Sequence, residues 1–444
     1  MRIKLSDHFT YKRLLKYTLA PIAMMIFTSI YSVVDGFFVS NFAGKSQFTA
    51  VNFIYPVIMI LGTVGFMFGT GGTALVAKTY GEGDKEKANR YFSLIVYFSF
   101  ALGVVVAVPT FIFIRQIASL MGAKGELLEN CVIYARILIA AVPFFILQVM
   151  FHSFFSVAEK PSLGFIITVA AGMTNIILDA VLVLSLPQNM KLAGAAIATA
   201  LSQFIGGIVP LIYFLRKNNS VLRLGKTEFY GKALLKSCGN GSSEFMSNIA
   251  MNVVGILYNI QLMNLVGENG VAAYGVMMYV SLVFSGAFIG FTVGSAPIVG
   301  YHYGANNRDE LKSLLQKSLR IVALFGVCMV TAAELLAVPI AKLFVAYDKN
   351  LYDITLQGFR IYALSFLFMG FGIFTSGFFT ALSDGLTSAL ISFIRTMVFQ
   401  TAAIMILPVV LGVNGIWLSI VVAEFMSLVL GVTFLIVKRK KYGY

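Results

Sequence analysis

The sequence predicts an all-α integral membrane protein, with twelve transmembrane helices in two six-helix lobes related by a pseudo-two-fold axis along the membrane normal. Hydrophobic residues make up 59% of the 444 residues and charged residues only 12%, whereas soluble domains average about 45–50% and about 25%. A soluble fold cannot bury that much apolar surface, so the excess must face lipid. Long apolar segments and a repeat between the two halves of the chain supply the helix count and the lobes.

The first half of the chain holds six apolar segments. A spanning helix needs about 20 apolar residues, and transmembrane β-strands would give much shorter, alternating segments, so each segment is predicted to be one helix. They cover residues 14–40, 48–79, 90–114, 128–156, 161–186 and 192–215. The breaks between them carry charges, glycine or proline, in the order NFAGKSQ, GEGDKEK, MGAKGE, AEK and LPQNMK.

The second half holds six more segments of the same kind. They cover residues 233–265, 271–303, 312–343, 352–382, 386–411 and 414–437. Their breaks are VGENG, GANNRDEL, FVAYDKNL, SDG and GV. The longest hydrophilic connection is RKNNSVLRLGKTEFYGK, residues 216–232, in the middle of the chain. The expected organisation is therefore an N-lobe (1–215), a cytoplasmic linker (216–232) and a C-lobe (233–444).

The two halves repeat each other at a nearly constant offset. GTGGTALVAKTYGEGD matches FTVGSAPIVGYHYGANN, which pairs Tyr80 with Tyr303, and FFSVAEKPSLGF matches FFTALSDGLTSA 224 residues later. Six helices is an even number, so both copies run in the same direction and the axis relating them lies along the membrane normal. Two such lobes with a cavity between them suit transport by alternating access.

Basic residues predict how the chain is oriented. The termini and the loops on their side carry 24 of the 33 Lys and Arg residues, whereas the opposite loops carry six. By the positive-inside rule both termini lie in the cytoplasm, and we expect a multi-pass protein of the cell inner (plasma) membrane. The net charge of +14 is thus a membrane feature, and no nucleic-acid partner is expected. We expect a monomer.

Two carboxylates within the membrane distinguish the first half from the second. Asp35 lies in SVVD and Asp179 in NIILD, and the equivalent positions in the second half are Gly255 and Ala403. Each aspartate is about twenty residues from the inner start of its helix, so both are predicted to lie at one depth, in the outer half. An aspartate at a helix centre costs about 3 kcal/mol on insertion scales, so two at one depth require an explanation.

Other polar residues are predicted to surround the two aspartates. Asn175 is one turn from Asp179, and Tyr31 is one turn from Asp35; the sixth helix brings Thr199 and Gln203 to similar depth. A shared proton or a sodium ion would compensate two buried carboxylates, with the proton favoured. The alternative is that each aspartate only accepts a hydrogen bond from a neighbour. Pro21, on the helix of Asp35, could act as a hinge that couples ion binding to cavity shape.

Gln203 in the first half and Glu244 in the second are the candidate residues of the substrate cavity. Glu244 ends the stretch GNGSSE, whose glycines and serines predict an unwound start of the seventh helix. There it could face the cavity and attract a cationic substrate, or it could cap the serines and the local backbone.

The remaining charges within the apolar segments are assigned structural roles. Arg395 and Glu424 lie near mid-depth and are predicted to pair. Arg136 and Arg360 occupy equivalent positions close to the outer face, where their side chains can reach the interface, and Glu334 is a possible partner for Arg360.

Cysteine and histidine give no sign of catalytic or metal chemistry. The three cysteines are far apart and inside or beside apolar segments, and the three histidines never form an HxxxH or HExxH spacing. We therefore expect no disulfide, no metal site other than a possible Na⁺ at the aspartates, no cofactor and no enzymatic activity. The basic, amphipathic start MRIKLSDHFTYKRLLK is not expected to be a removable signal peptide.

Over nearly its whole length the chain resembles multidrug and toxic compound extrusion (MATE) transporters of the bacterial DinF/MepA-like branch. The local signatures are SVVDGFFVSNFAG, GEGDKEKANR, NIILD and GAAIAT. The resemblance implies a secondary active antiporter that exports organic cations or amphiphilic drugs in exchange for H⁺ or Na⁺. It implies an N-lobe cation site with Tyr31 in support, made by Asp35, Asn175, Asp179 and Thr199.

The rival function is the export or flipping of a lipid-linked oligosaccharide by a related transporter. A lipid-linked pyrophosphate would favour a cavity lined by several Arg or Lys side chains. Only three arginines lie within the predicted helices, and the carboxylates are the residues that distinguish the halves. Drug export is therefore preferred.

Overall fold

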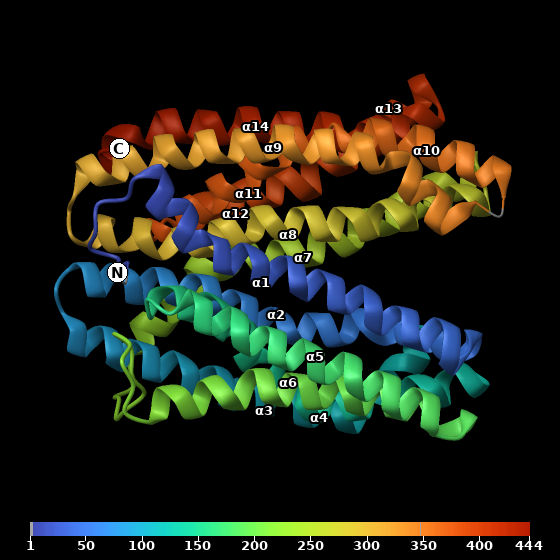
Figure 1. Ribbon diagram of the computed structural model, residues 1–444, viewed down its shortest axis with the longest axis horizontal. Coiled ribbons are helices and arrows are strands. Elements are labelled where there is room, and N and C mark those ends of the chain that lie inside the picture. Colours follow the sequence, from blue (N-terminus) through green and yellow to red (C-terminus); the bar gives the residue numbers. More distant parts are fainter. Residues whose placement is uncertain (1–2, 347) are drawn as a thin grey trace.

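The computed structural model describes residues 3–346 and 348–444, and within these ranges it contains helices and no β-strand (Figure 1). The first lobe consists of α1 (Tyr11–Phe38), α2 (Lys45–Gly81), α3 (Lys85–Leu120), α4 (Gly125–Val157), α5 (Pro161–Ser185) and α6 (Lys191–Leu215). The second lobe consists of α7 (Gly231–Leu265), α8 (Glu268–Gly304), α9 (Arg308–Val345), α10 (Lys349–Ala363), α11 (Phe366–Ala381), α12 (Gly385–Phe393), α13 (Thr401–Leu411) and α14 (Val413–Tyr442). A short π-helical turn (Val39–Ala43) extends α1, and a single 3₁₀ turn (Gln188–Met190) precedes α6.

The predicted all-α membrane fold is confirmed. In the described ranges ten helices are long and apolar enough to cross a membrane, and α10 with α11 forms an eleventh, bent span. The remaining long helix, α7, has 35 residues but a polar first half. It completes twelve spans, which follow the twelve apolar segments closely.

Two spans are irregular in ways that their composition does not reveal. The tenth bends by 48° between α10 and α11, where the amides of Leu364 and Ser365 bond to carbonyls three residues earlier, the tighter 3₁₀ pattern. The eleventh passes from α12 into a π-helical stretch (Ile394–Gln400) before α13. Both irregular stretches are apolar on either side, so hydrophobic patterning alone cannot locate them.

The expected unwound start of the seventh helix is wrong, because α7 is a regular helix throughout GNGSSEFMSN. Its glycines serve close packing instead. A Cβ atom added at Gly241 would lie 1.9 Å from the Met67 carbonyl oxygen of α2, and one added at Gly385 would lie 2.2 Å from the Gly239 carbonyl oxygen. Here α7 touches α2 and α12 backbone to backbone.

Four helix–helix turns on the side of the termini share one geometry, which reflects the repeat in the sequence. Each places one residue at positive φ just before the next helix begins. In the second lobe, Asp384 follows such a residue and its carboxylate accepts the Thr387 amide, which caps α12. The four positive-φ residues are Gly83, Glu159, Asn306 and Ser383.

The lobes touch near the termini and separate towards the other end. A Cβ atom added at Gly290 of α8 would lie 2.5 Å from Ile22 Cα of α1, so α1 packs closely on α8. A Cβ atom added at Gly81 of α2 would lie 2.0 Å from the Tyr301 carbonyl oxygen of α8, so α2 packs closely on α8 as well. Beyond the hydrogen bond of 3.0 Å from Ser29 Oγ to the Leu282 carbonyl, α1 and α8 diverge (Figure 1). A Cβ atom at Gly36, Gly255 or Gly275 would meet no atom within 4 Å. The lobes are therefore in contact through α1 and α8 on the side of the termini, and these two helices diverge towards the opposite side.

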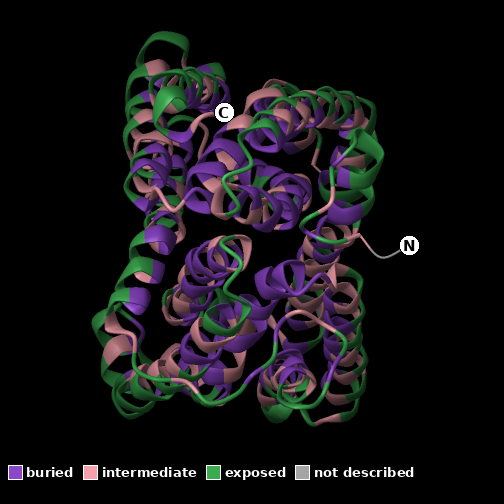
Figure 2. Cartoon of the chain, turned by 90° about the vertical axis from the view of Figure 1, so that its left-hand side faces the viewer, coloured by how far each residue is buried: buried purple, intermediate pink, exposed green. Residues whose placement is uncertain are grey.

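Figure 2, which views the molecule from the side of the termini, shows buried residues inside both lobes and between them, with exposed residues around the outside. The segment before α1 crosses this closed face. The Leu5 amide donates to Glu159 in the first lobe (2.9 Å), and the Phe9 amide donates to Glu310 in the second (2.8 Å). Both apolar side chains are fully buried. We call residues 3–10 the N-terminal strap.

Candidate functional site

The two aspartates distinguished by the sequence come together between α1 and α5. Their carboxyl groups interact directly, although 144 residues separate them in the chain. Gly172 permits this approach, because a Cβ atom there would lie 2.5 Å from the Phe27 ring and 2.8 Å from the Tyr31 ring of α1. Asp179 is completely buried and Asp35 is half-buried.

Thr199 and Asn175 extend the pair into a small polar cluster. The Thr199 hydroxyl donates to Asp35 Oδ1 (3.5 Å), and Asn175 Nδ2 donates to Thr199 Oγ1 (3.4 Å). Both Asp179 carboxyl oxygens and Asn175 Oδ1 receive no hydrogen bond from any described residue. Buried oxygens without donors are costly, so this cluster has room for a proton or for a hard cation.

The sequence reasoning missed three residues near this cluster. Tyr134 of α4 is buried near both aspartates, Tyr55 of α2 lies near Asp35, and Gln148 of α4 interacts with Tyr31. A signal for two of them was present. At the offset of 224 that pairs the fourth helix with the tenth, Tyr134 and Gln148 both correspond to glycines, just as Asp35 does.

Gln203 and Pro21 lie apart from the aspartate pair. Gln203 is buried one turn beyond Thr199, its Oε1 accepts no hydrogen bond, and no contact among the described residues joins it to either aspartate. Pro21 lies in the contact between the lobes, because a Cβ atom at Gly290 would be 2.6 Å from the Pro21 carbonyl oxygen. Helix α1 continues through Pro21 without a break.

The second lobe holds a different set of charges. Arg395, in the π-helical stretch, binds Glu424 with both Nε and Nη2 at 2.9 Å, which confirms the predicted pair, and Gln400 Nε2 donates to the same carboxylate at 3.3 Å. Glu424 is completely buried. Glu244 on α7 is half-buried, and Arg395 is the cation nearest to it. Arg395 thus pairs with Glu424 and acts on Glu244 only through its charge at longer range. The three side chains together carry a net charge of −1 when all are ionised.

No group of three or more His, Cys, Asp or Glu side chains suited to a metal ion occurs in residues 3–346 and 348–444. The aspartate pair itself consists of two ionisable carboxyl groups, and the buried oxygens of Asp179 lack donors among the described residues, a chemistry suited to binding a proton or a small cation.

The comparisons with known proteins agree with this picture. The MatE family model matches twice, over residues 21–181 and 245–406. The chain is 26% identical over 418 residues to the multidrug export protein MepA of Staphylococcus haemolyticus (strain JCSC1435), which covers 93% of this chain and 90% of the relative.

Solved structures share the fold at 22% sequence identity. One, described as an outward-facing conformation of a multidrug resistance MATE family transporter, superposes with a TM-score of 0.92 over 98% of this chain and 97% of that one. Another, a MATE in complex with MaL6, gives 0.91 over the same shares. The two family matches begin 224 residues apart, the offset of the internal repeat, and together they span most of the chain. The protein therefore belongs to the MatE family of membrane transporters.

Proposed function

We propose that the protein is a secondary active multidrug efflux antiporter, which exports cationic or amphiphilic compounds in exchange for H⁺ or Na⁺ by alternating access. The observation that carries the proposal is the contact between Asp35 and Asp179 inside one lobe, in the half of the molecule where α1 and α8 diverge. The export function named for the MepA relative supports it.

The aspartate pair suits the coupling ion. Two adjacent carboxylates in a medium of low dielectric constant repel each other, so the pair gains a proton or a cation far more readily than an isolated carboxylate does. One shared proton needs no further ligand. Sodium would use the oxygens of Asp35, Asn175, Asp179 and Thr199, with Tyr31 steadying the arrangement. We favour the proton, because it requires fewer groups to converge.

The second lobe suits the substrate. Glu244 lies in the half of the molecule nearer the termini, and its nearest described cation, Arg395, is already paired with Glu424. Glu244 can therefore attract an organic cation without a second coupling site. Gln203 supplies a further polar group to the cavity. Pro21, which packs against α8, is the point where α1 bends as the lobes exchange conformations.

The placement in the membrane follows from the basic residues. We place both termini in the cytoplasm of a cell whose inner (plasma) membrane holds the protein as a monomer, so the side on which α1 and α8 diverge faces outside. The lobes are residues 1–215 and 233–444, joined by the cytoplasmic linker 216–232.

The test compares substrates of the two rival functions. The purified protein is reconstituted in proteoliposomes with an imposed pH gradient, and movement is measured for a cationic dye, a neutral amphiphile and a lipid-linked oligosaccharide precursor. We expect movement of the dye, weaker movement of the neutral compound and none of the precursor. Movement of the precursor alone would replace drug export by lipid flipping.

A further inference from the structure

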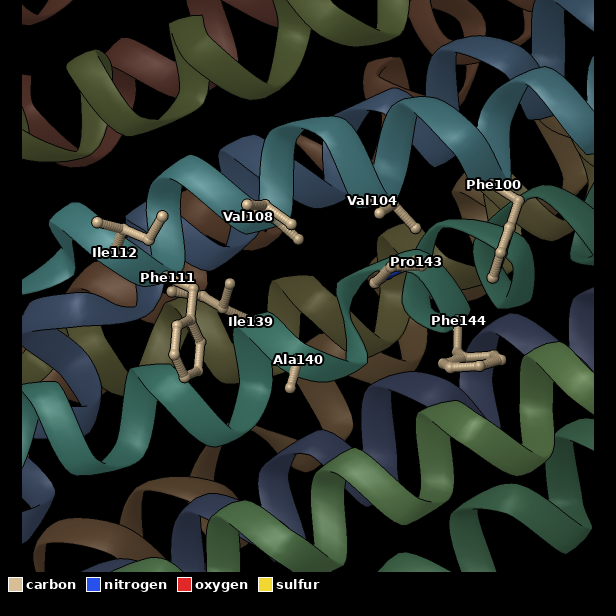
Figure 3. A pocket seen from close by; sticks show the side chains of 10 residues that line it. Phe100, Val104, Val108, Phe111, Ile112, Ile139, Ala140, Pro143 and Phe144 are labelled. Atoms are coloured by element: carbon tan, nitrogen blue, oxygen red, sulfur yellow. The ribbon is translucent and has the colours of Figure 1, made fainter.

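The lipid-facing side of the first lobe carries an apolar groove between α3 and α4. Its cavity volume is about 380 Å³, and every residue that lines it is apolar, from Phe100 to Ile112 on α3 and from Ile139 to Phe144 on α4. Figure 3 shows these side chains between the two helices, with Ile112 and Phe111 at one end and Phe100 and Phe144 at the other.

The groove has the length of a lipid chain in one leaflet. Twelve residues separate Phe100 from Ile112, which corresponds to about 18 Å along a helix, and one leaflet contributes about half of a hydrocarbon core of about 30 Å. The deep end is closed by aromatic rings, because Phe144 packs on Phe100 (centroids 5.7 Å apart) and on Phe204 of α6 (4.7 Å). A Cβ atom added at Gly103 of α3 would lie 3.0 Å from Pro143 Cα of α4. The two helices therefore touch there and form the floor of the groove.

An exposed arginine stands at the shallow end. Arg136 lies one turn before Ile139 and Ala140, and its guanidinium carbon is 5.6 Å from the centroid of Phe111, a lining residue. No carboxylate among the described residues pairs with it. By contrast Arg360, its equivalent in the second lobe, has Glu334 at 3.9 Å.

Arg136 lies deep enough in the membrane that its charge needs an anionic partner. The ion pair between Arg115 and Glu129 joins the outer ends of α3 and α4, and Arg136 lies seven residues, about 10 Å, further in along α4. An arginine at that depth reaches for the interface, and an unpaired charge there is unfavourable. A phosphate at the level of the lipid headgroups would satisfy it, because guanidinium binds phosphate with two parallel hydrogen bonds.

We propose that this groove binds an acidic phospholipid of the leaflet that faces away from the termini. One acyl chain lies along the groove, and the headgroup phosphate binds Arg136. The apolar lining accepts a hydrocarbon chain, which brings no polar group that would need a partner. A helix from a second copy would fill the groove but would leave the guanidinium unpaired.

The test is a lipid titration of the full-length, delipidated protein in detergent, followed by native mass spectrometry. Phosphatidylglycerol and phosphatidylcholine are the probes. We expect one tightly retained phosphatidylglycerol on the wild type, and at least about fivefold weaker binding to Arg136→Gln, since one basic residue contributes about that much to acidic-lipid binding. Arg360→Gln, the matched control, should bind as the wild type does.

The groove itself is tested by Ala140→Phe, which fills it from an exposed position and should lose retention of both lipids. The thermal unfolding midpoint of Ala140→Phe reports whether this variant is folded. If it is not, Val108→Phe serves the same purpose. Unchanged phosphatidylglycerol binding in Arg136→Gln, or in the folded filling variant, would overturn the proposal. The proposal would also be overturned if the wild type formed a dimer that the filling variant abolishes while lipid retention stays the same.

Discussion

Asp35 and Asp179 are neighbours in space, but water reaches them unequally. Asp35 is half-buried and accepts a hydrogen bond from Thr199, whereas Asp179 is fully buried and its oxygens accept none from the described residues. If the pair binds the coupling ion as proposed, the ion would meet the more exposed Asp35 before Asp179. The two residues would then have different parts in the coupling step.

We predict that Asp35→Asn and Asp179→Asn each abolish uphill efflux, because an amide can neither exchange a proton nor balance a cation. Membrane expression should stay near that of the wild type, since asparagine is of similar size. Efflux of a cationic dye from cells, corrected for expression, measures this. Asp309→Asn, an exposed position on the side of the termini, is the control and should be silent. Wild-type efflux by either variant would remove the pair from the coupling step.

Glu244→Gln should change substrate preference rather than coupling, because Glu244 belongs to the charge set of the second lobe. Export of cationic dyes should fall roughly fivefold, the equivalent of about 1 kcal/mol for one partly exposed ion pair, whereas export of neutral amphiphiles should change little. Competition assays with both classes measure the ratio. Equal losses for both classes would indicate a folding role for Glu244.

Asp384 predicts acid sensitivity on the side of the termini. Burial alone would raise its pKa, but hydrogen bonds from Tyr442 and Thr387, together with Lys438, hold the pKa below its ordinary value. A lowered pKa stabilises the fold above about pH 4 and loses this effect as the pH falls further.

Asp384→Ala should therefore cost about 1 kcal/mol at pH 7, in line with the loss of a helix cap. It should also lose less stability than the wild type between pH 5 and pH 3, because the variant has no carboxylate to protonate. Thermal unfolding in detergent at each pH measures both effects. Identical acid profiles for the two proteins would show that Asp384 contributes nothing through its charge.

The aspartates could be predicted from the sequence because each half of the chain can be compared with the equivalent positions of the other half. A carboxylate opposite Gly255 or Ala403 is conspicuous in an apolar helix, and the same comparison would have indicated Tyr134 and Gln148. Gln203 has no such signal, because helix length places it at a similar depth but does not fix the direction of its side chain.

Among the elements, the N-terminal strap is held by both lobes at once. Glu159 binds it to the first lobe and Glu310 to the second, where Glu310 accepts the Phe9 amide and lies 2.6 Å from His8 Nδ1. A strap anchored to both lobes links them on the side of the termini. We therefore expect it to stabilise the contact between the lobes on that side.

Glu310→Ala should weaken this closure, because charge-assisted hydrogen bonds of this kind contribute about 1.5–3 kcal/mol each. We expect the population with separated lobes on the side of the termini to rise roughly tenfold. Distances between spin labels at exposed Lys85 and Lys312, one in each lobe, report that population. Glu86→Ala is the matched control, since its partner Arg90 is on the same helix. The same distance distribution in Glu310→Ala and the wild type would refute a role for the strap.

Element boundaries followed well from composition, but element regularity did not. The apolar segments located every span, because the hydrocarbon core sets their length. GNGSSEFMSN was misinterpreted because glycine serves equally in an unwound stretch and in close helix packing, and only the neighbour at Met67 decides between them. The bend at Ser365 is set by tertiary packing and has no local signal.

For the whole molecule, duplication and asymmetry have separate consequences. The repeat gives two lobes of the same fold, and glycines of α2, α7 and α8 bring the lobes into close contact on the side of the termini. The asymmetry places a carboxyl pair without a cationic partner among the described residues in the first lobe, whereas Glu424 of the second lobe is paired with Arg395. In the proposed function, coupling ion and substrate would therefore bind in separate lobes, and a movement of the lobes past each other would connect them.

The most direct test of this account is dye movement in proteoliposomes at zero membrane potential, with a pH gradient and a Na⁺ gradient imposed one at a time. The account predicts that the pH gradient alone, in sodium-free buffer, drives wild-type protein to move a cationic dye against its concentration gradient. Asp35→Asn and Asp179→Asn should only let the dye equilibrate. Uphill movement that depends on Na⁺ at constant pH, with none under the pH gradient alone, would contradict proton coupling. Uphill movement by either variant would contradict the assignment of the carboxyl pair.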